Sequence, residues 1–190
     1  SEDGNRLYIA LHGAGSIAVL NLVTMELLEM LRVSETLGVV EAWDVISTGQ
    51  NELFVSASTG GSGWIVKLDP NNPETALRVA DETRIDDQTN FEISPFNDYL
   101  YVNDTNWNLY KLDINQPLAP IVLREGMDSL FRTSNLAVSK DGMFLYTAGG
   151  QKVSTSTFNV LSNVPVGVPR FSSVVDDHLY FAAEETDNSI

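Results

Sequence analysis

The stretch RLYIALHGAGSIAVLNL, residues 6–22, decides the fold. It holds two apolar segments separated by the glycine-containing sequence HGAG. Short apolar runs bounded by turn residues are typical of strands, and glycine supplies the backbone conformations that a tight reversal requires. The stretch therefore predicts a β-hairpin whose strands cover residues 7–11 and 16–22.

The first half of this hairpin recurs along the chain. Five runs place an aromatic residue directly after a leucine: RLYIA, ELFVS, YLYVN, FLYTA and HLYFA. Their leucines lie in steps of 46, 47, 45 and 34 residues, at Leu7, Leu53, Leu100, Leu145 and Leu179. A motif that returns at a nearly constant interval indicates a repeated structural unit. We expect these five leucines to be buried at equivalent sites.

Each unit has the composition of four short strands. A strand precedes each of the last four leucine runs, at residues 42–47, 91–94, 136–139 and 171–175. A third strand follows the first three runs, at 17–22, 64–69 and 109–113, and a fourth at 27–33, 76–79 and 120–123. Four strands in about 46 residues is typical of a β-propeller blade. A β-sandwich would also supply many strands, but not this regular recurrence.

The predicted fold class is therefore an all-β β-propeller of four-stranded antiparallel blades, with four to five blades present. Complete blades cover residues 42–79, 91–123 and 135–168, and partial blades cover 6–33 and 171–183. Because incomplete blades leave unpaired strand edges, we interpret the chain as a segment of a larger ring. The remaining blades would come from the parent protein or from another chain.

The residues also resemble a known family. DGNRLYIALHGAGSIAVLNLVT, residues 3–24, is similar to the YVTN repeat of surface-layer-type propellers, in which an Asp-Gly turn leads into Leu-Tyr-Val. The sequence YVND at 101–104 is closest to the tetrapeptide that names the family, and KDGMFLY at 140–146 repeats the turn. The resemblance implies a propeller that serves as a binding surface, a surface-layer part or a sugar-lactone hydrolase.

The composition excludes several classes of function. Hydrophobic residues make up 43% of the 190 residues and charged residues 19%, as in a folded domain. The formal charge of −15 argues against nucleic acid and against anionic lipid surfaces as partners. No apolar run approaches the roughly 20 residues of a membrane-spanning helix, so we expect no membrane insertion. The absence of cysteine excludes disulfides and thiolate metal sites.

A binding site is expected where the connections between strands gather on one face of the blades. The connection at 41–44 and the turn at 103–108 bring the densest polar groups there, beside tryptophans that could line a site. The predicted ligand-binding residues are Trp43, Asp44, Asn103, Asp104, Asn106, Trp107 and Asn108. Trp43 and Trp64 have a second interpretation, as side chains packed between blades.

Oxygen-bearing side chains alternate in the same turn, as they do in calcium loops. Asp104, Asn106 and Asn108 are therefore candidate calcium ligands, although the glycine and the distal glutamate of a complete calcium loop are missing. No other cofactor is expected. A structural turn with polar side chains at its tip is the alternative interpretation.

No catalytic constellation stands out. The chain has two histidines, His12 and His178, and neither accompanies a Gly-x-Ser-x-Gly nucleophile motif. We therefore expect a non-catalytic binding or scaffolding propeller of an exported protein, located in the periplasm, outside the cell or on its surface. Its ligand would be a protein or a carbohydrate. The alternatives are a sugar-lactone-type hydrolase that uses a metal or carboxylates at the channel mouth, and a structural unit of a surface lattice or filament.

Overall fold

The computed structural model describes the backbone of residues 4–33, 37–38, 41–48, 51–58, 63–80, 85, 89–106, 108–126, 136–147, 149–163, 168–175 and 178–184. Side chains are described in these ranges as far as residue 163. The named elements of this part of the chain are all β-strands, which confirms the all-β prediction. Among the described residues, no helix is long and apolar enough to cross a membrane.

The strands form five antiparallel sheets in chain order. The first sheet has three strands: β1 (Arg6–Leu11), β2 (Ser16–Asn21) and β3 (Leu27–Arg32). The second has four: β4 (Glu41–Ser47), β5 (Leu53–Ser58), β6 (Gly63–Asp69) and β7 (Asn72–Arg78). The third also has four: β8 (Asn90–Ile93), β9 (Tyr99–Asn103), β10 (Asn108–Asp113) and β11 (Ile121–Gly126).

The fourth sheet completes the four-stranded set, and the fifth is a pair of strands. The fourth contains β12 (Leu136–Val138), β13 (Phe144–Thr147), β14 (Gln151–Ser154) and β15 (Val160–Asn163). The fifth contains β16 (Val168–Val175) and β17 (His178–Glu184). In each four-stranded sheet, every strand pairs with the next along the chain, so each sheet is a meander of the kind that forms propeller blades.

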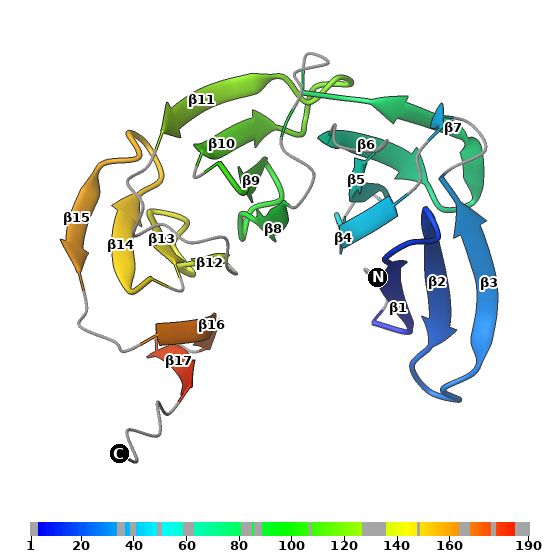
Figure 1. The fold of residues 1–190 in the computed structure, drawn as a ribbon, viewed down its shortest axis with the longest axis horizontal. Helices are drawn as coiled ribbons and strands as arrows, with labels where there is room; N and C mark the ends of the chain where they lie inside the picture. Colours follow the sequence, from blue (N-terminus) through cyan, green and yellow to red (C-terminus); the bar gives the residue numbers. More distant parts are fainter. Residues whose placement is uncertain are drawn as a thin grey trace, which may run out of the picture.

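The sheets stand side by side along an open arc (Figure 1). Strands β4, β8, β12 and β16 line its inner side, and β3, β7, β11 and β15 lie on its outer side. The first sheet and the β16–β17 pair occupy opposite ends of the arc (Figure 1), and β16 pairs with β17. Neighbouring inner strands contact one another, β4 with β8, β8 with β12, and β12 with β16.

The core lies between successive sheets as three clusters of buried side chains. The first joins Ile17 and Val19 of the first sheet to Leu53 and Val55 of the second. The second joins the second sheet to the third, and the third joins the third to the fourth. Alternate residues of each strand face opposite neighbours, because side chains alternate across a strand. Burial between sheets is therefore what holds the arc together.

The five leucines expected at equivalent buried sites do not share one environment. Leu53, Leu100 and Leu145 are fully buried, whereas Leu7 is 39% exposed, so the expectation is wrong for Leu7. No described element packs on the face of β1 that carries Leu7, whereas the corresponding face of each of the next three sheets is covered by the preceding one. The Leu179 side chain lies outside the described residues.

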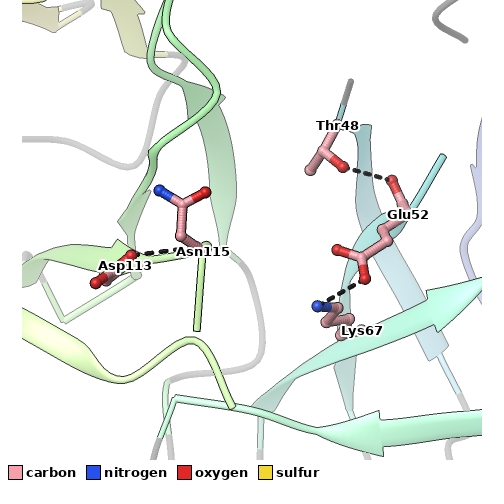
Figure 2. A network of polar contacts seen from close by, with 5 residues as sticks. All are labelled: Thr48, Glu52, Lys67, Asp113 and Asn115. Atoms are coloured by element: carbon pink, nitrogen blue, oxygen red, sulfur yellow. Dashed lines mark hydrogen bonds and ion pairs between the residues drawn. The ribbon is translucent and has the colours of Figure 1, made fainter. Parts of the chain in front are cut away.

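Turns at the ends of the strands are fixed by local polar contacts (Figure 2). Beside the β4–β5 turn, Lys67 forms an ion pair with Glu52, 2.8 Å from Nζ to Oε1, and the Thr48 hydroxyl donates to the Glu52 carbonyl oxygen. In the β10–β11 connection, the Asn115 backbone N–H donates to Asp113 Oδ1 at 3.1 Å. An aspartate that accepts from the backbone two residues later is the usual chemistry of such turns.

Candidate functional site

A β-bulge in β4 positions the most distinctive aromatic side chain of the molecule. The pairing of β4 with β5 shifts register between Ala42 and Asp44, so Trp43 is the extra residue. The strand predicted at 42–47 is observed as β4, and the connection predicted at 41–44 forms the first half of that strand. A bulge re-aims side chains locally, and bulges are frequent next to binding sites.

Trp43 lies against the turn that joins β1 to β2. Its ring is 4.0 Å from the His12 ring, centroid to centroid, at an interplanar angle of 58°. The His12 side chain is 58% exposed, so the pair lies where solvent reaches it. Trp43 Nε1 is buried and has no hydrogen-bond partner among the described residues. A buried donor without a partner costs free energy, and Trp64 Nε1 is in the same situation.

Glu41, at the start of β4, adds a carboxylate to this pair. Glu41 Oε1 lies 3.9 Å from His12 Nε2, and Glu41 Oε2 accepts a 2.9 Å hydrogen bond from the Ser58 hydroxyl. A serine nucleophile needs an imidazole at its own oxygen to accept the proton. Here the serine donates to the carboxylate, and the imidazole lies on the far side of Glu41. The arrangement suits ligand binding better than nucleophilic catalysis.

Two carboxylates on the inner strands join neighbouring sheets. Asp44 of β4 accepts from the Phe91 backbone N–H of β8 at Oδ2, and from its neighbour Val45 at Oδ1, both at 2.8 Å. Glu92 of β8 lies 3.5 Å from the Val138 backbone nitrogen of β12. Each carboxylate therefore links the inner strand of one sheet to that of the next.

The same two groups have perturbed acidities. Burial raises the pKa of Asp44, and the hydrogen bonds from Phe91 and Val45 oppose that rise. Burial also raises the pKa of Glu92 to about 7, against the hydrogen bond from Val138 and with a further rise from the charge of Asp44. Perturbed acidities of this kind are frequent at functional sites and also occur in structural networks. Glu92 is not among the residues predicted from the sequence, where its only signal is an acidic residue between two apolar ones in FEI.

The turn at 103–108 is held by its own side chains. Asp104 is 2% exposed. Its Oδ1 accepts from the Asn108 backbone N–H at 2.8 Å, and its Oδ2 accepts from the Tyr110 hydroxyl at 2.8 Å. The Asn108 amide nitrogen also lies 2.9 Å from Oδ2. Donors therefore surround the carboxylate that the sequence offers as a calcium ligand, which supports the structural interpretation of this turn.

The structure separates the predicted site residues into two groups. Trp43 lies against His12 and the first sheet, whereas Asn103, Asp104 and Asn108 belong to the third sheet, where Asn103 is buried and Asn106 is exposed. Asp44 contacts the third sheet, because its carboxylate accepts a hydrogen bond from the Phe91 backbone N–H. Trp107 lies outside the described residues. Within the described part of the chain, no three His, Asp or Glu side chains are grouped so that they could hold a metal ion.

Trp64 belongs to a different contact from Trp43. The Arg78 guanidinium carbon lies 4.1 Å from the centroid of the Trp64 ring, and Arg78 Nη2 donates to the Leu37 carbonyl oxygen at 3.1 Å. A cation over an aromatic face is a stabilising arrangement. Trp43 is among the ligand-binding residues predicted from the sequence, whereas His12 and Glu41 are not. The bulge that brings the three together has no local signal.

No protein-family model matches the chain, and no curated protein matches it. Among solved structures, the chain is similar to "Kuenenia stuttgartiensis Hydrazine Synthase", with a TM-score of 0.65 and 17% sequence identity. The similarity covers 92% of this chain and 49% of that chain. At this identity it concerns the fold alone. This chain therefore shares an extended all-β architecture with a segment of a chain about twice as long.

Proposed function

We propose that the chain is part of a β-propeller ring with a non-catalytic binding function, and that its ligand binds at the cluster of His12, Glu41, Trp43 and Ser58. The observation that carries the proposal is the bulge at Trp43, which sets an aromatic ring against a half-exposed histidine beside a carboxylate. The order of hydrogen bonds around Glu41 argues for recognition rather than for attack on a substrate.

The chemistry of the cluster suits a carbohydrate. A sugar offers C–H faces that pack on an aromatic ring and hydroxyls that donate to a carboxylate. With a net charge of −15, the protein would repel an anionic sugar, so the ligand is a neutral or amino sugar.

The resemblance of the repeats to the YVTN family supports a location outside the cytoplasm, in an exported or cell-surface protein. The strongly acidic composition is compatible with that location. Both points come from the sequence. Secretion of the full-length protein in its native host would test them, by immunoblotting of culture medium, envelope and cytoplasm.

Titration monitored by NMR tests the binding site. The three tryptophan indole N–H resonances would be assigned with Trp43→Phe and Trp64→Phe, and neutral and amino oligosaccharides would be added to the unmodified chain. We expect a saturable shift of the Trp43 resonance, and binding weakened at least tenfold in Glu41→Gln and in Trp43→Ala. Trp64→Phe is the matched control because its ring contacts Arg78.

If no oligosaccharide moves the Trp43 resonance, the carbohydrate proposal is wrong. If a protein from the native envelope moves it and Glu41→Gln abolishes that shift, the cluster binds protein. Equal weakening in Trp64→Phe and Trp43→Ala would show that the loss is a general effect of destabilisation.

A hydrolase is the second candidate because Glu92, whose pKa lies near 7, is electrostatically coupled to Asp44. A carboxyl group of that acidity could exchange protons at neutral pH. Hydrolysis of simple lactones by the chain, with a pH profile that Glu92→Gln abolishes, would favour it. Absence of turnover in the presence of sugar binding would favour the binding function.

A further inference from the structure

The first sheet has one apolar face that no described element covers. Two rows of cross-strand neighbours form it: Leu7, Leu20 and Leu27 in one row, and Ile9, Ala18 and Met30 in the other. We call these six residues the Leu7 face. Leu7, Ile9, Leu27 and Met30 are 39%, 37%, 57% and 42% exposed, whereas the small Ala18 is 8% exposed. A contiguous exposed apolar patch of this kind usually marks an interaction site.

The corresponding faces of the next three sheets are buried. Leu53 and Val55 of the second sheet pack against the first, and both are fully buried. Leu100 and Val102 of the third sheet pack against the second, and Leu145 of the fourth packs against the third. Leu7 and Ile9 occupy on β1 the places that Leu53 and Val55 occupy on β5. The Leu7 face therefore corresponds to the covered faces of the next three sheets, but no described sheet packs against it.

The opposite side of each of the first three sheets has a constant chemistry. The residue after the leucine is aromatic and faces the following sheet: Tyr8 packs in the first cluster, Phe54 in the second and Tyr101 in the third. Each of the three junctions among the first four sheets therefore sets a leucine side against an aromatic-centred side. By the same pattern, a sheet that packs on the Leu7 face would present an aromatic-centred side to it.

We propose that the Leu7 face is covered by a further propeller blade, an antiparallel sheet with an aromatic residue at the centre of its second strand. The contact would continue the series of junctions that already runs along the arc (Figure 1). A second copy of this chain is a poorer occupant because each copy carries a net charge of −15, which opposes self-association. The inference rests on the proposal that the chain is part of a propeller ring, and it specifies the surface that the neighbouring blade presents; it does not depend on the ligand site.

An extended chain tests the proposal by supplying such a blade. Residues 90–142 would be placed directly before Asn5, which adds a copy of the third sheet, its following connection and an inner strand. Gly142 of the added copy then takes the place of Gly4. The two glycines have similar positive φ, 69° and 68°, and each lies two residues before the start of a strand. The added copy presents Tyr101 and Leu109 to the Leu7 face, as the original does to the fourth sheet.

The first measurement is the fluorescence of the dye ANS, which binds exposed apolar surface. We expect at least a threefold lower signal from the extended chain than from the 190-residue chain. The second is the melting temperature of Leu7→Lys. That variant should melt within a few degrees of its parent in the 190-residue chain and more than ten degrees below its parent in the extended chain. Tyr101→Lys with Leu109→Lys, made only in the added copy, is the matched control and should restore the ANS signal.

Three results would overturn the proposal. One is an ANS signal as high in the extended chain as in the 190-residue chain. Another is an added blade that proteases digest while the rest of the chain survives, because a blade docked on the Leu7 face would be protected. The third is dimerisation of the 190-residue chain in sedimentation velocity that Ile9→Lys abolishes and Leu161→Lys, on the outer strand β15, does not. That result would make a second copy the occupant.

Discussion

The Asp44 carboxylate of β4 accepts a hydrogen bond from the backbone N–H of Phe91 in β8, with 2.8 Å between Oδ2 and N. The bond crosses from the inner strand of one sheet to that of the next. An inner strand has a paired neighbour within its sheet on one side only, so a side chain that satisfies a backbone donor across the junction fixes the relative position of two sheets.

The Asp44→Ala variant should lose about 1–3 kcal/mol of unfolding free energy, because the Phe91 N–H is left without its acceptor in a partly buried place. Urea denaturation followed by circular dichroism measures the change. Asp113→Ala is the control: Asp113 also accepts from a backbone N–H, but in an exposed turn, and its removal should cost no more than about 0.5 kcal/mol. Equal losses in the two variants would contradict a role for Asp44 in joining sheets.

The free energy of unfolding should fall as the pH rises from about 4.5 to about 7, because of the raised pKa of Glu92. The pKa of this group is 4.5 as its ordinary value and about 7 in the folded protein. Between these values the folded state keeps a proton that the unfolded state has lost, so the unfolding free energy decreases with pH and levels off above about 7. The contribution of Glu92 to this decrease is roughly 3 kcal/mol. The raised pKa of Asp44 acts in the same direction.

Denaturation at pH 5 and pH 8 checks this, with Glu92→Gln as the test variant. The glutamine stays neutral, so the variant should lose much of the difference between the two pH values and should be more stable than the parent chain at pH 8. A variant that keeps the full difference would assign the pH dependence to other groups.

Truncation of the recurring leucines should reduce the free energy of unfolding by an amount that depends on how deeply each one is buried. Leu53→Ala, Leu100→Ala and Leu145→Ala should each cost about 2–5 kcal/mol, because each leaves a cavity between two sheets. Leu7→Ala should cost about 1 kcal/mol or less, since water already reaches the Leu7 face. Chemical denaturation of the four variants measures the costs. A loss at Leu7 as large as that at Leu53 would show that the Leu7 face is already buried in solution.

Replacing Asp104 should destabilise the chain independently of calcium. Asp104→Ala removes the acceptor of the buried Tyr110 hydroxyl and of the Asn108 backbone N–H, which should cost about 1–3 kcal/mol. The loss in melting temperature should be the same in calcium and in chelator. A calcium-dependent rise in the melting temperature of the parent chain that Asp104→Ala abolishes would instead assign a calcium site to this turn.

The sequence alone predicts the strands and their class because strand signals are local. The leucine-aromatic runs, the alternation of apolar residues and the Asp-Gly turns each act within a few residues. They predict a strand at each of the five leucine-aromatic runs, and the structure has strands β1, β5, β9, β13 and β17 there. The sequence also names Trp43 and Asp44 among its candidate site residues, from their polar and aromatic character beside a strand.

Only the tertiary structure decides which faces are covered and which side chains meet. Leu7 and Leu53 have the same local sequence signal, but a sheet packs on one and not on the other. The bulge that turns Trp43 to His12 depends on the pairing of β4 with β5, and the environment of Glu92 depends on the approach of a third inner strand. Burial and register are relations between segments far apart in the chain, so no local pattern encodes them.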